Sequence, residues 1–264
     1  MTGIKDTDDP KTPAGKYAVL RKVARLLDLF TVQRPEWGVG EIAQALGLPL
    51  SSTSEILRVI ESEGFLRRVK TGRYRVGWRV VAMHRVLNET SELLDVAEEA
   101  MQGLLARFNE TMHLAALERG RVVYLNKMQG TRALQINSTG VGYRHVAHAT
   151  GVGKLLMAHR PWTEVQRMLE AEGMPALTPN TITTPERLHE ELGRIRAQGY
   201  AYDLEEGMPE LCCVAAPIRD FTGEVVAALS LSLPAYRFGE VRDRYREALL
   251  QTTHGVSERL GYVG

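Results

Sequence analysis

The strongest constraint on this chain is a basic segment, residues 67–79 with the sequence RRVKTGRYRVGWR, which holds six Lys or Arg side chains and no acidic one. It directly follows a stretch whose apolar spacing predicts helix, turn and helix. Residues 16–79 contain 12 basic and 6 acidic residues, whereas residues 80–264 contain 19 basic and 23 acidic. Because a local basic surface releases counterions from DNA whatever the net charge, the total charge of +1 does not argue against a DNA partner.

Three short helices are predicted ahead of the basic segment. Apolar residues at helical spacing indicate a first helix that ends before Pro35 and a second over residues 40–46. Ser51 or Ser52 can cap a third helix, which runs to about Glu63. Two helices joined by a short turn and followed by basic residues are the usual arrangement of a DNA-binding motif.

Two β-prone runs within residues 65–76 flank Gly72, which can supply the positive φ of a hairpin turn. Three helices and a basic hairpin make a mainly α-helical winged helix-turn-helix domain, which we place at residues 16–78, after a disordered tail over residues 1–15. The third helix of such a domain enters the major groove, and the hairpin reaches phosphates or the minor groove. The expected DNA-binding residues are Ser51, Ser52, Thr53, Ser54, Arg58, Arg67, Arg68, Lys70, Arg73 and Arg75.

Some of these charges have a simpler interpretation. Arg67, Arg68 and Lys70 can be a solvated strand edge, and Glu55 is either an acceptor for a cytosine amino group or a solvated helix charge. Six basic residues without an acidic one, next to the third helix, favour DNA contact for the hairpin.

The rest of the chain predicts a second domain of another class. Residues 79–90 are expected to form a connecting helix, and residues 91–264 contain alternating strands and helices. Strand pairs are predicted within residues 112–128 and 211–233, each with a turn in the middle. The expected fold of this domain is therefore α/β, of the α+β type, with an antiparallel sheet.

Targeting signals are not evident in the sequence. No apolar run approaches the roughly 18 residues that cross a bilayer, and the first ten residues contain no signal-like apolar core. The two cysteines, Cys212 and Cys213, are adjacent, which suits neither a disulfide nor a CxxC site. We expect a cytoplasmic protein without a membrane partner.

A possible ligand site follows from the alternation of residues 224–233. One face of this strand is apolar, and the other carries Ala228, Ser230 and Ser232. Its partner strand places Cys213 on one face with Ala215. Small residues with two hydroxyls can line a concavity, or they can simply admit a closely packed helix; the spacing alone leaves both interpretations open.

Many short motifs along the chain resemble one family. Residues 47–57 (GLPLSSTSEIL), 63–67 (EGFLR) and 72–77 (GRYRVG) resemble the DNA-binding domain of IclR-type transcriptional regulators. The effector domain of that family is similar to residues 111–118, 123–127, 148–154, 178–183, 195–203, 213–217 and 228–232. The resemblance extends from about residue 16 to the end, and its motifs occur in the family's order.

The resemblance implies a repressor or activator that binds a double-stranded operator as a homodimer or tetramer. Its C-terminal domain would be GAF-like and would bind a small organic effector, often an acid or an aromatic metabolite. The implied effector-binding residues are Gly151, Val152, Asp203, Cys213, Ser230 and Ser232. No catalytic residue, metal or cofactor is implied.

The chain departs from the family pattern in places. The family often has a basic residue at the positions of Leu50 and Glu55 and a proline at that of Val146, so the usual contacts of these positions do not transfer.

Three other interpretations compete for parts of the second domain. Residues 150–154 (TGVGK) resemble a phosphate-binding loop but lack its full glycine spacing and its final Ser or Thr. His145 and His148 could ligate a metal, although no cluster of further ligands accompanies them.

The third interpretation is an enzyme with Cys213 as nucleophile. Such an enzyme requires a base, whereas the neighbouring residues are acids that raise a thiol pKa. A ligand-free dimerisation module with a filled core is a further alternative.

Overall fold

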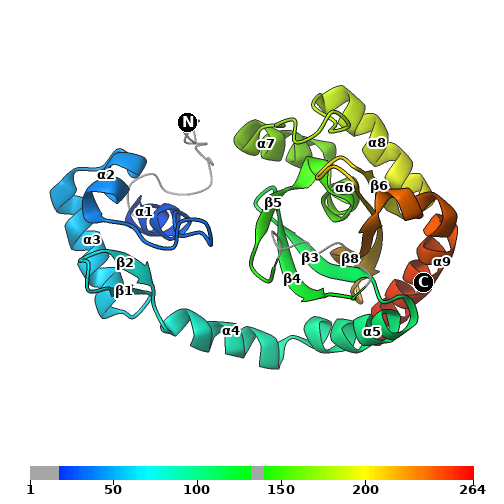
Figure 1. Ribbon diagram of the computed structural model, residues 1–264, viewed down its shortest axis with the longest axis horizontal. Coiled ribbons are helices and arrows are strands. Elements are labelled where there is room, and N and C mark those ends of the chain that lie inside the picture. Colours follow the sequence, from blue (N-terminus) through cyan, green and yellow to red (C-terminus); the bar gives the residue numbers. More distant parts are fainter. Residues whose placement is uncertain (1–17, 132–139) are drawn as a thin grey trace. The chain divides into compact units, whose positions relative to one another are not determined.

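The computed structural model describes residues 18–131 and 140–264, which form two compact units, one up to Ser91 and one from Glu92 (Figure 1). The tail expected over residues 1–15 lies outside the described residues.

The N-terminal unit is a winged helix-turn-helix. Its elements are α1 (Ala18–Leu27), α2 (Val39–Leu46), α3 (Leu50–Ser62), β1 (Leu66–Arg68), β2 (Tyr74–Val76) and α4 (Arg79–Thr90). The helices bury Leu26, Ile42 and Leu57 against Leu66 of the hairpin. The strands β1 and β2 pair antiparallel.

The turn between α2 and α3 depends on Gly47, whose φ of 64° is in the left-handed region that favours glycine. The start of α3 corrects the capping prediction. The helix begins at Leu50 with Pro49 at its N-cap, because the Pro49 carbonyl already accepts the amide of Thr53 at 3.0 Å. Neither Ser51 nor Ser52 is the cap, and both are exposed within the first turn.

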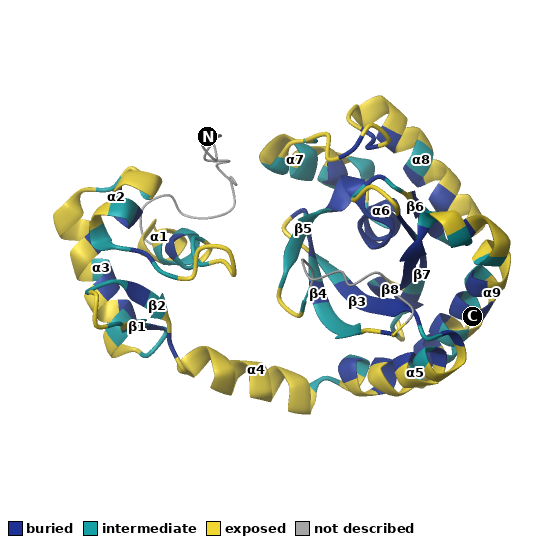
Figure 2. Cartoon of the chain, viewed as in Figure 1, coloured by how far each residue is buried: buried dark blue, intermediate teal, exposed yellow. Residues whose placement is uncertain are grey.

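The helix α4 differs from the rest of this unit because all of its residues are exposed (Figure 2). Its apolar side chains include Val80, Met83, Val86 and Leu87, each at least 40% exposed. An apolar helix face of this kind commonly marks a surface that contacts another molecule.

The C-terminal unit is an antiparallel sheet between two layers of helices. Its elements are α5 (Glu92–Phe108), β3 (Thr111–Glu118), β4 (Arg121–Met128), β5 (Arg144–Val146), a 3₁₀ turn (Ala147–Ala149), α6 (Gly151–Ala158), α7 (Trp162–Glu172), α8 (Pro185–Gln198), β6 (Ala201–Leu204), β7 (Leu211–Arg219), β8 (Val225–Pro234) and α9 (Ala235–Arg259). The strand order is β5-β4-β3-β8-β7-β6, and every pairing is antiparallel.

Each face of the sheet has its own hydrophobic core. The helices α5 and α9 cover the face that carries Leu229 and Leu231, and α6 and α8 cover the face that carries Ala115 and Ala215 (Figure 1). In β8 the alternation predicted from the sequence holds from Ala227 to Leu233, but Val225 packs into the other core. The reason is an irregularity at the C-terminal end of β7. Ile218 pairs with Ala227, but the next residue, Arg219, pairs with Val225, so one residue of β8 is left out of the pairing.

Other elements differ from the sequence-based expectation. The helices α6 and α7 and the strands β5 and β6 lie outside the two strand pairs that the sequence predicted. In the described part of the chain, the helices are all too short or too polar to cross a bilayer.

Candidate functional site

A row of short polar side chains crosses the sheet beneath α6. The strand register places Asp203 of β6 opposite Cys213 of β7, and Cys213 opposite Ser232 of β8. Ser230 of β8 lies opposite His113 of β3. Because residues opposite each other in neighbouring strands point to the same face, these side chains share one wall.

The start of α6 closes over this wall. Thr150 is the N-cap, and its Oγ1 accepts the amide of Gly153 at 3.1 Å, while the Thr150 carbonyl accepts the amide of Lys154 at 2.9 Å. The first two amides of the helix, those of Gly151 and Val152, have no intrahelical partner by construction. A helix start with two open amides is suited to bind an anion.

Gly153 is the glycine that this arrangement requires. A Cβ at this position would lie 2.2 Å from the carbonyl oxygen of Ala147, which no side chain can tolerate. Because glycine has no Cβ, α6 can start directly above the sheet.

Between α6 and the sheet lies a cavity of about 350 Å³. All six effector-binding residues expected from the sequence lie on its wall. The described residues that line it are His113, Tyr124, Tyr143, His145, Thr150, Gly151, Val152, Leu177, Asp203, Gly207, Met208, Leu211, Cys213, Ser230 and Ser232. A concave site with aromatic walls and a few convergent polar groups is typical of small-molecule binding.

The rings of His113, Tyr124 and Tyr143 on the cavity wall were not expected from the sequence. The ring centroids of His113 and Tyr124 are 4.8 Å apart, those of Tyr124 and Tyr143 6.3 Å, and those of Tyr143 and His145 6.0 Å. Burial, with a smaller contribution from the charge of Lys127, lowers the pKa of His113 to about 3, so its imidazole is neutral. Alternation along residues 111–115 would have placed His113 on the cavity face.

Asp203 is the carboxyl group of the cavity, and it is almost fully buried. Its Oδ1 accepts the amide of Glu206 at 2.7 Å and that of Gly207 at 3.4 Å. Burial and, second, the negative charge of Glu206 raise the pKa of Asp203 to about 7, although the two amides and Lys154 act in the opposite direction. Asp203 therefore carries its proton for much of the time at neutral pH.

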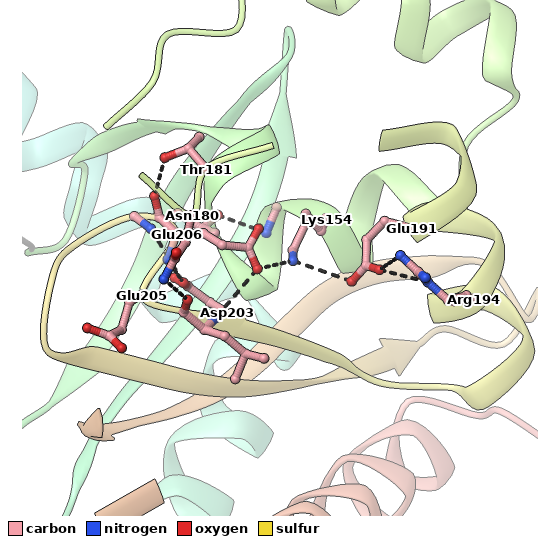
Figure 3. A network of polar contacts seen from close by, with 12 residues as sticks. Lys154, Asn180, Thr181, Glu191, Arg194, Asp203, Glu205 and Glu206 are labelled. Carbon is pink, nitrogen blue, oxygen red and sulfur yellow. Dashed lines mark hydrogen bonds and ion pairs between the residues drawn. The ribbon is translucent and has the colours of Figure 1, made fainter. Parts of the chain in front are cut away.

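The same loop is anchored by a buried ion pair (Figure 3). The ammonium of Lys154 lies 2.5 Å from Glu206 Oε1 and 3.5 Å from Glu191 Oε1, and the Lys154 side chain is 1% exposed. This pairing joins α6, α8 and the loop after β6. The cavity wall is thus held by a charged network rather than by apolar packing alone.

The environment of Cys213 opposes nucleophilic chemistry. Its thiol donates to Ser232 Oγ at 3.1 Å, and burial followed by the charge of Asp203 raises its pKa well above the ordinary value. A thiol without thiolate character is a poor nucleophile. Within the described residues, no group of three or more His, Cys, Asp or Glu side chains could hold a metal ion, and His148 instead contacts the Pro175 carbonyl at 3.1 Å.

On the DNA-binding unit, the expected residues separate into exposed and engaged side chains. Ser51, Ser52, Ser54, Arg58, Arg68 and Lys70 are exposed, as is Glu55. Thr53 corrects the expectation: it is fully buried, and its hydroxyl donates to the Pro49 carbonyl at 3.0 Å, so it cannot contact a base.

The hairpin arginines are also divided. Arg73 lies 2.6 Å from Glu41 Oε2, and Arg75 lies 2.6 Å from Glu36 Oε1. These two guanidinium groups pair with acids of their own unit, a role that the charge count did not reveal. Arg67 is partly buried, with its guanidinium 5.1 Å from the centre of the Trp78 ring.

Comparisons with known proteins match both units. The model of the IclR helix-turn-helix domain matches residues 19–70, and the model of the bacterial transcriptional regulator IclR C-terminal domain matches residues 84–258. The HTH-type transcriptional regulators XynR and KdgR of Escherichia coli K12 are each 31% identical to the chain. The XynR match covers 92% of this chain and 97% of that protein, and the KdgR match covers 98% of both.

A solved structure is similar over the same span. It is an IclR homolog from Microbacterium hydrocarbonoxydans in complex with 4-hydroxybenzoate, 27% identical with a TM-score of 0.76. The match covers 92% of this chain and 99% of that one.

Proposed function

Because the chain belongs to the IclR family of bacterial transcriptional regulators, we propose that residues 16–78 bind an operator and that residues 91–264 bind an acid effector which changes operator affinity. The protein is a ligand-responsive, DNA-binding transcriptional regulator and not an enzyme. A bacterial transcriptional regulator binds DNA in the cytoplasm, so we assign the protein to that compartment.

The observation that carries the effector proposal is the cavity beneath α6. It combines the open amides of Gly151 and Val152 with the short polar side chains of Asp203, Ser230 and Ser232. The amides attract the carboxylate of a ligand, and the aromatic wall accepts its carbon skeleton. The 4-hydroxybenzoate bound by the Microbacterium homolog is a ligand of this chemistry.

For the DNA contact we propose the exposed part of the expected set. Ser51, Ser52 and Ser54 lie on the first turns of α3, with Arg58 one turn later, and Arg68 and Lys70 lie on the hairpin. The serines have the reach for base edges or phosphates, and the basic side chains supply phosphate contacts.

Regulation then requires a difference in ligand affinity. A ligand changes operator binding only if it prefers either the DNA-competent or the incompetent arrangement. We assign the role of connecting lever to α4, the helix over residues 79–90, because it is the last element of the N-terminal unit and leads into the second unit at Glu92.

Operator binding by a homo-oligomer is the remaining part of the proposal. The helix α4 presents Val80, Met83 and Leu87 along one stripe, all exposed. In a two-fold symmetric dimer, the stripes of two copies would pack against each other and become buried. Such a dimer would match the two-fold symmetry of an operator. Light scattering of Met83→Glu/Leu87→Glu is expected to show a smaller assembly than the wild type, while Arg85→Ala, on the same helix, is expected to leave the mass unchanged.

The test of the function combines DNA and ligand. Fluorescence anisotropy with the protein's own promoter fragment and a random duplex is expected to show specific binding that 4-hydroxybenzoate or another small acid changes by roughly 5- to 150-fold, the usual range of allosteric coupling. Ser230→Val, which removes a hydroxyl from the cavity, is expected to bind DNA but lose the response. Equal affinity for both duplexes at every salt concentration would contradict the proposal.

A further inference from the structure

A group of charged side chains lies beside the Asp203 end of the cavity. Asp203 and Glu206 are buried near one ammonium group, that of Lys154, while Glu191 is partly exposed and also pairs with Arg194 (Figure 3). Lys154 lies within ion-pair distance of both Glu206 and Glu191, so its charge is already shared between two partners. In the described part of the chain, no cation forms an ion pair with Asp203.

Asp203 is also next to the anion-binding start of α6. The position that a Cβ of Gly151 would occupy is 3.5 Å from the Asp203 amide nitrogen and 3.6 Å from its Cβ. A ligand carboxylate that reaches the amides of Gly151 and Val152 must therefore lie beside the Asp203 side chain. Two carboxylates placed together in a buried site repel each other strongly, and one of them takes up a proton.

We propose that the cavity binds its acid ligand together with one proton from solvent, which Asp203 holds in the complex. Protonated Asp203 donates its O–H to a carboxylate oxygen of the ligand, while Oδ1 continues to accept the amides of Glu206 and Gly207. The cavity therefore selects carboxylic acids, and it binds them more tightly as the pH falls. The proposal rests on the proposed function, in which an acid effector enters this cavity.

The titratable groups around Asp203 leave it as the group that takes up the proton. Burial and the charge of Glu206 raise the pKa of Asp203 to about 7, so the proton is available near neutral pH. On β7, burial raises the pKa of Cys212 to about 11 and that of Cys213 well above its ordinary value. On β4, burial also raises the pKa of Tyr124, so these three groups stay protonated between pH 6 and pH 8.

The two histidines of the cavity do not compete for the proton. Burial lowers the pKa of both His113 and His145, which leaves their rings neutral above pH 6.5. The sign of the effect follows from Asp203 alone. As the pH rises from 6 to 8, the ligand-free protein loses the Asp203 proton, and ligand affinity falls about tenfold.

The experiment uses the full chain and four small carboxylic acids as ligands. The sodium salts of 4-hydroxybenzoate, benzoate, pyruvate and gluconate are screened by thermal shift at pH 6, and the strongest stabiliser is titrated calorimetrically at pH 6 and pH 8. Buffers of different ionisation enthalpy measure the protons taken up. We expect close to one proton per ligand at pH 8, little uptake at pH 6, and about tenfold weaker binding at pH 8.

The outcomes separate the two proposals. Binding without proton uptake at pH 8 would overturn the proton-linked mechanism and leave the effector site standing. Failure of all four acids to stabilise the protein would count against the acid effector site itself, and with it the proton linkage.

Three substitutions identify the group that takes up the proton. Asp203→Asn keeps a donor for the ligand but cannot titrate, so its affinity is expected to be equal at pH 6 and pH 8, with no uptake. Glu206→Gln removes the neighbouring negative charge, and its binding is expected to weaken at a lower pH than in the wild type. The matched control is Glu205→Gln, since Figure 3 shows that side chain pointing away from Lys154 and its Oε2 accepts the Glu210 amide at 2.8 Å.

The control variant is expected to keep the wild-type pH dependence. Persistence of proton uptake in a folded Asp203→Asn protein, verified by circular dichroism, would show that another group carries the proton and would overturn the assignment.

Discussion

The hairpin of the DNA-binding unit and the cavity wall of the effector unit are both built on antiparallel strands, yet their polar residues behave differently. In the cavity wall, Asp203, Cys213 and Ser232 are short, and the register alone brings them side by side. In the hairpin, Arg73 and Arg75 are long and reach back to acids of their own unit. Backbone geometry therefore determines where a short polar side chain lies, whereas a long cationic one also depends on its neighbours.

Lys154 is a long cationic side chain that is buried with its partner, so its removal tests how much such a neighbour contributes to stability. Lys154→Met leaves Glu206 buried without its cation, whereas Glu191 keeps Arg194, and the loss is expected to destabilise the protein by about 3–5 kcal/mol. The exposed pair of Arg85 and Glu89 on α4 is the matched control, and Arg85→Ala is expected to cost less than about 1 kcal/mol. Urea unfolding followed by circular dichroism measures both. Equal losses would contradict the idea that the Lys154 network holds the cavity.

Asp203 provides the second comparison, through the pH dependence of stability. Its pKa in the folded protein, about 7, is above the ordinary value of 3.8, so folding favours the protonated form. Its contribution to stability is complete below about pH 4 and is lost as the pH rises through 7. Wild type is expected to lose on the order of 3–4 kcal/mol relative to Asp203→Asn between pH 4 and pH 7.5. Thermal unfolding over this range, with Asp220→Asn at an exposed turn as control, checks the expectation.

The contrast also explains what the sequence could predict. Alternation was sufficient for Ser230 and Ser232, because residues that are two positions apart in a strand point to the same face whatever surrounds them. It failed for Val225, since a skipped residue in the pairing with β7 cannot be read from one strand. His113 had the same readable signal as Ser230 but was not recognised, because an apolar strand with one histidine resembles ordinary core.

In the DNA-binding unit, the fold was easier to predict than the contacts. Glycine and proline positions located the helices and the hairpin to within a few residues. The partners of Arg73 and Arg75 could not be predicted, because Glu36 and Glu41 are distant in the sequence and approach only when the domain folds. The burial of Thr53 was missed for a related reason. Residues 51–54 all carry hydroxyl groups, and the prediction treated them as one exposed patch, whereas the helix turns Thr53 inward.

The division of the hairpin residues can be tested by salt dependence. Arg68→Ala/Lys70→Ala removes two exposed charges and is expected to reduce the slope of log K against log salt by about 0.9 for each phosphate that is no longer neutralised. Arg73→Ala removes a guanidinium that is already paired with Glu41, and its slope is expected to stay near that of the wild type. Anisotropy titrations from 50 to 200 mM salt provide the slopes. A larger change for Arg73→Ala would return that residue to the DNA interface.

The smallest effects distinguish Thr53 from its neighbour Ser54. Thr53→Ala removes a buried hydroxyl that donates to Pro49 at the start of α3, and a loss of about 1 kcal/mol of stability is expected. Ser54→Ala changes an exposed position, so its stability is expected to stay within about 0.5 kcal/mol while operator affinity falls. Urea unfolding and anisotropy on both variants give the two measurements for each. If Thr53→Ala weakened operator binding without loss of stability, α3 would have to rotate on DNA to expose it, and burial in the free protein would no longer predict which hydroxyls read the operator.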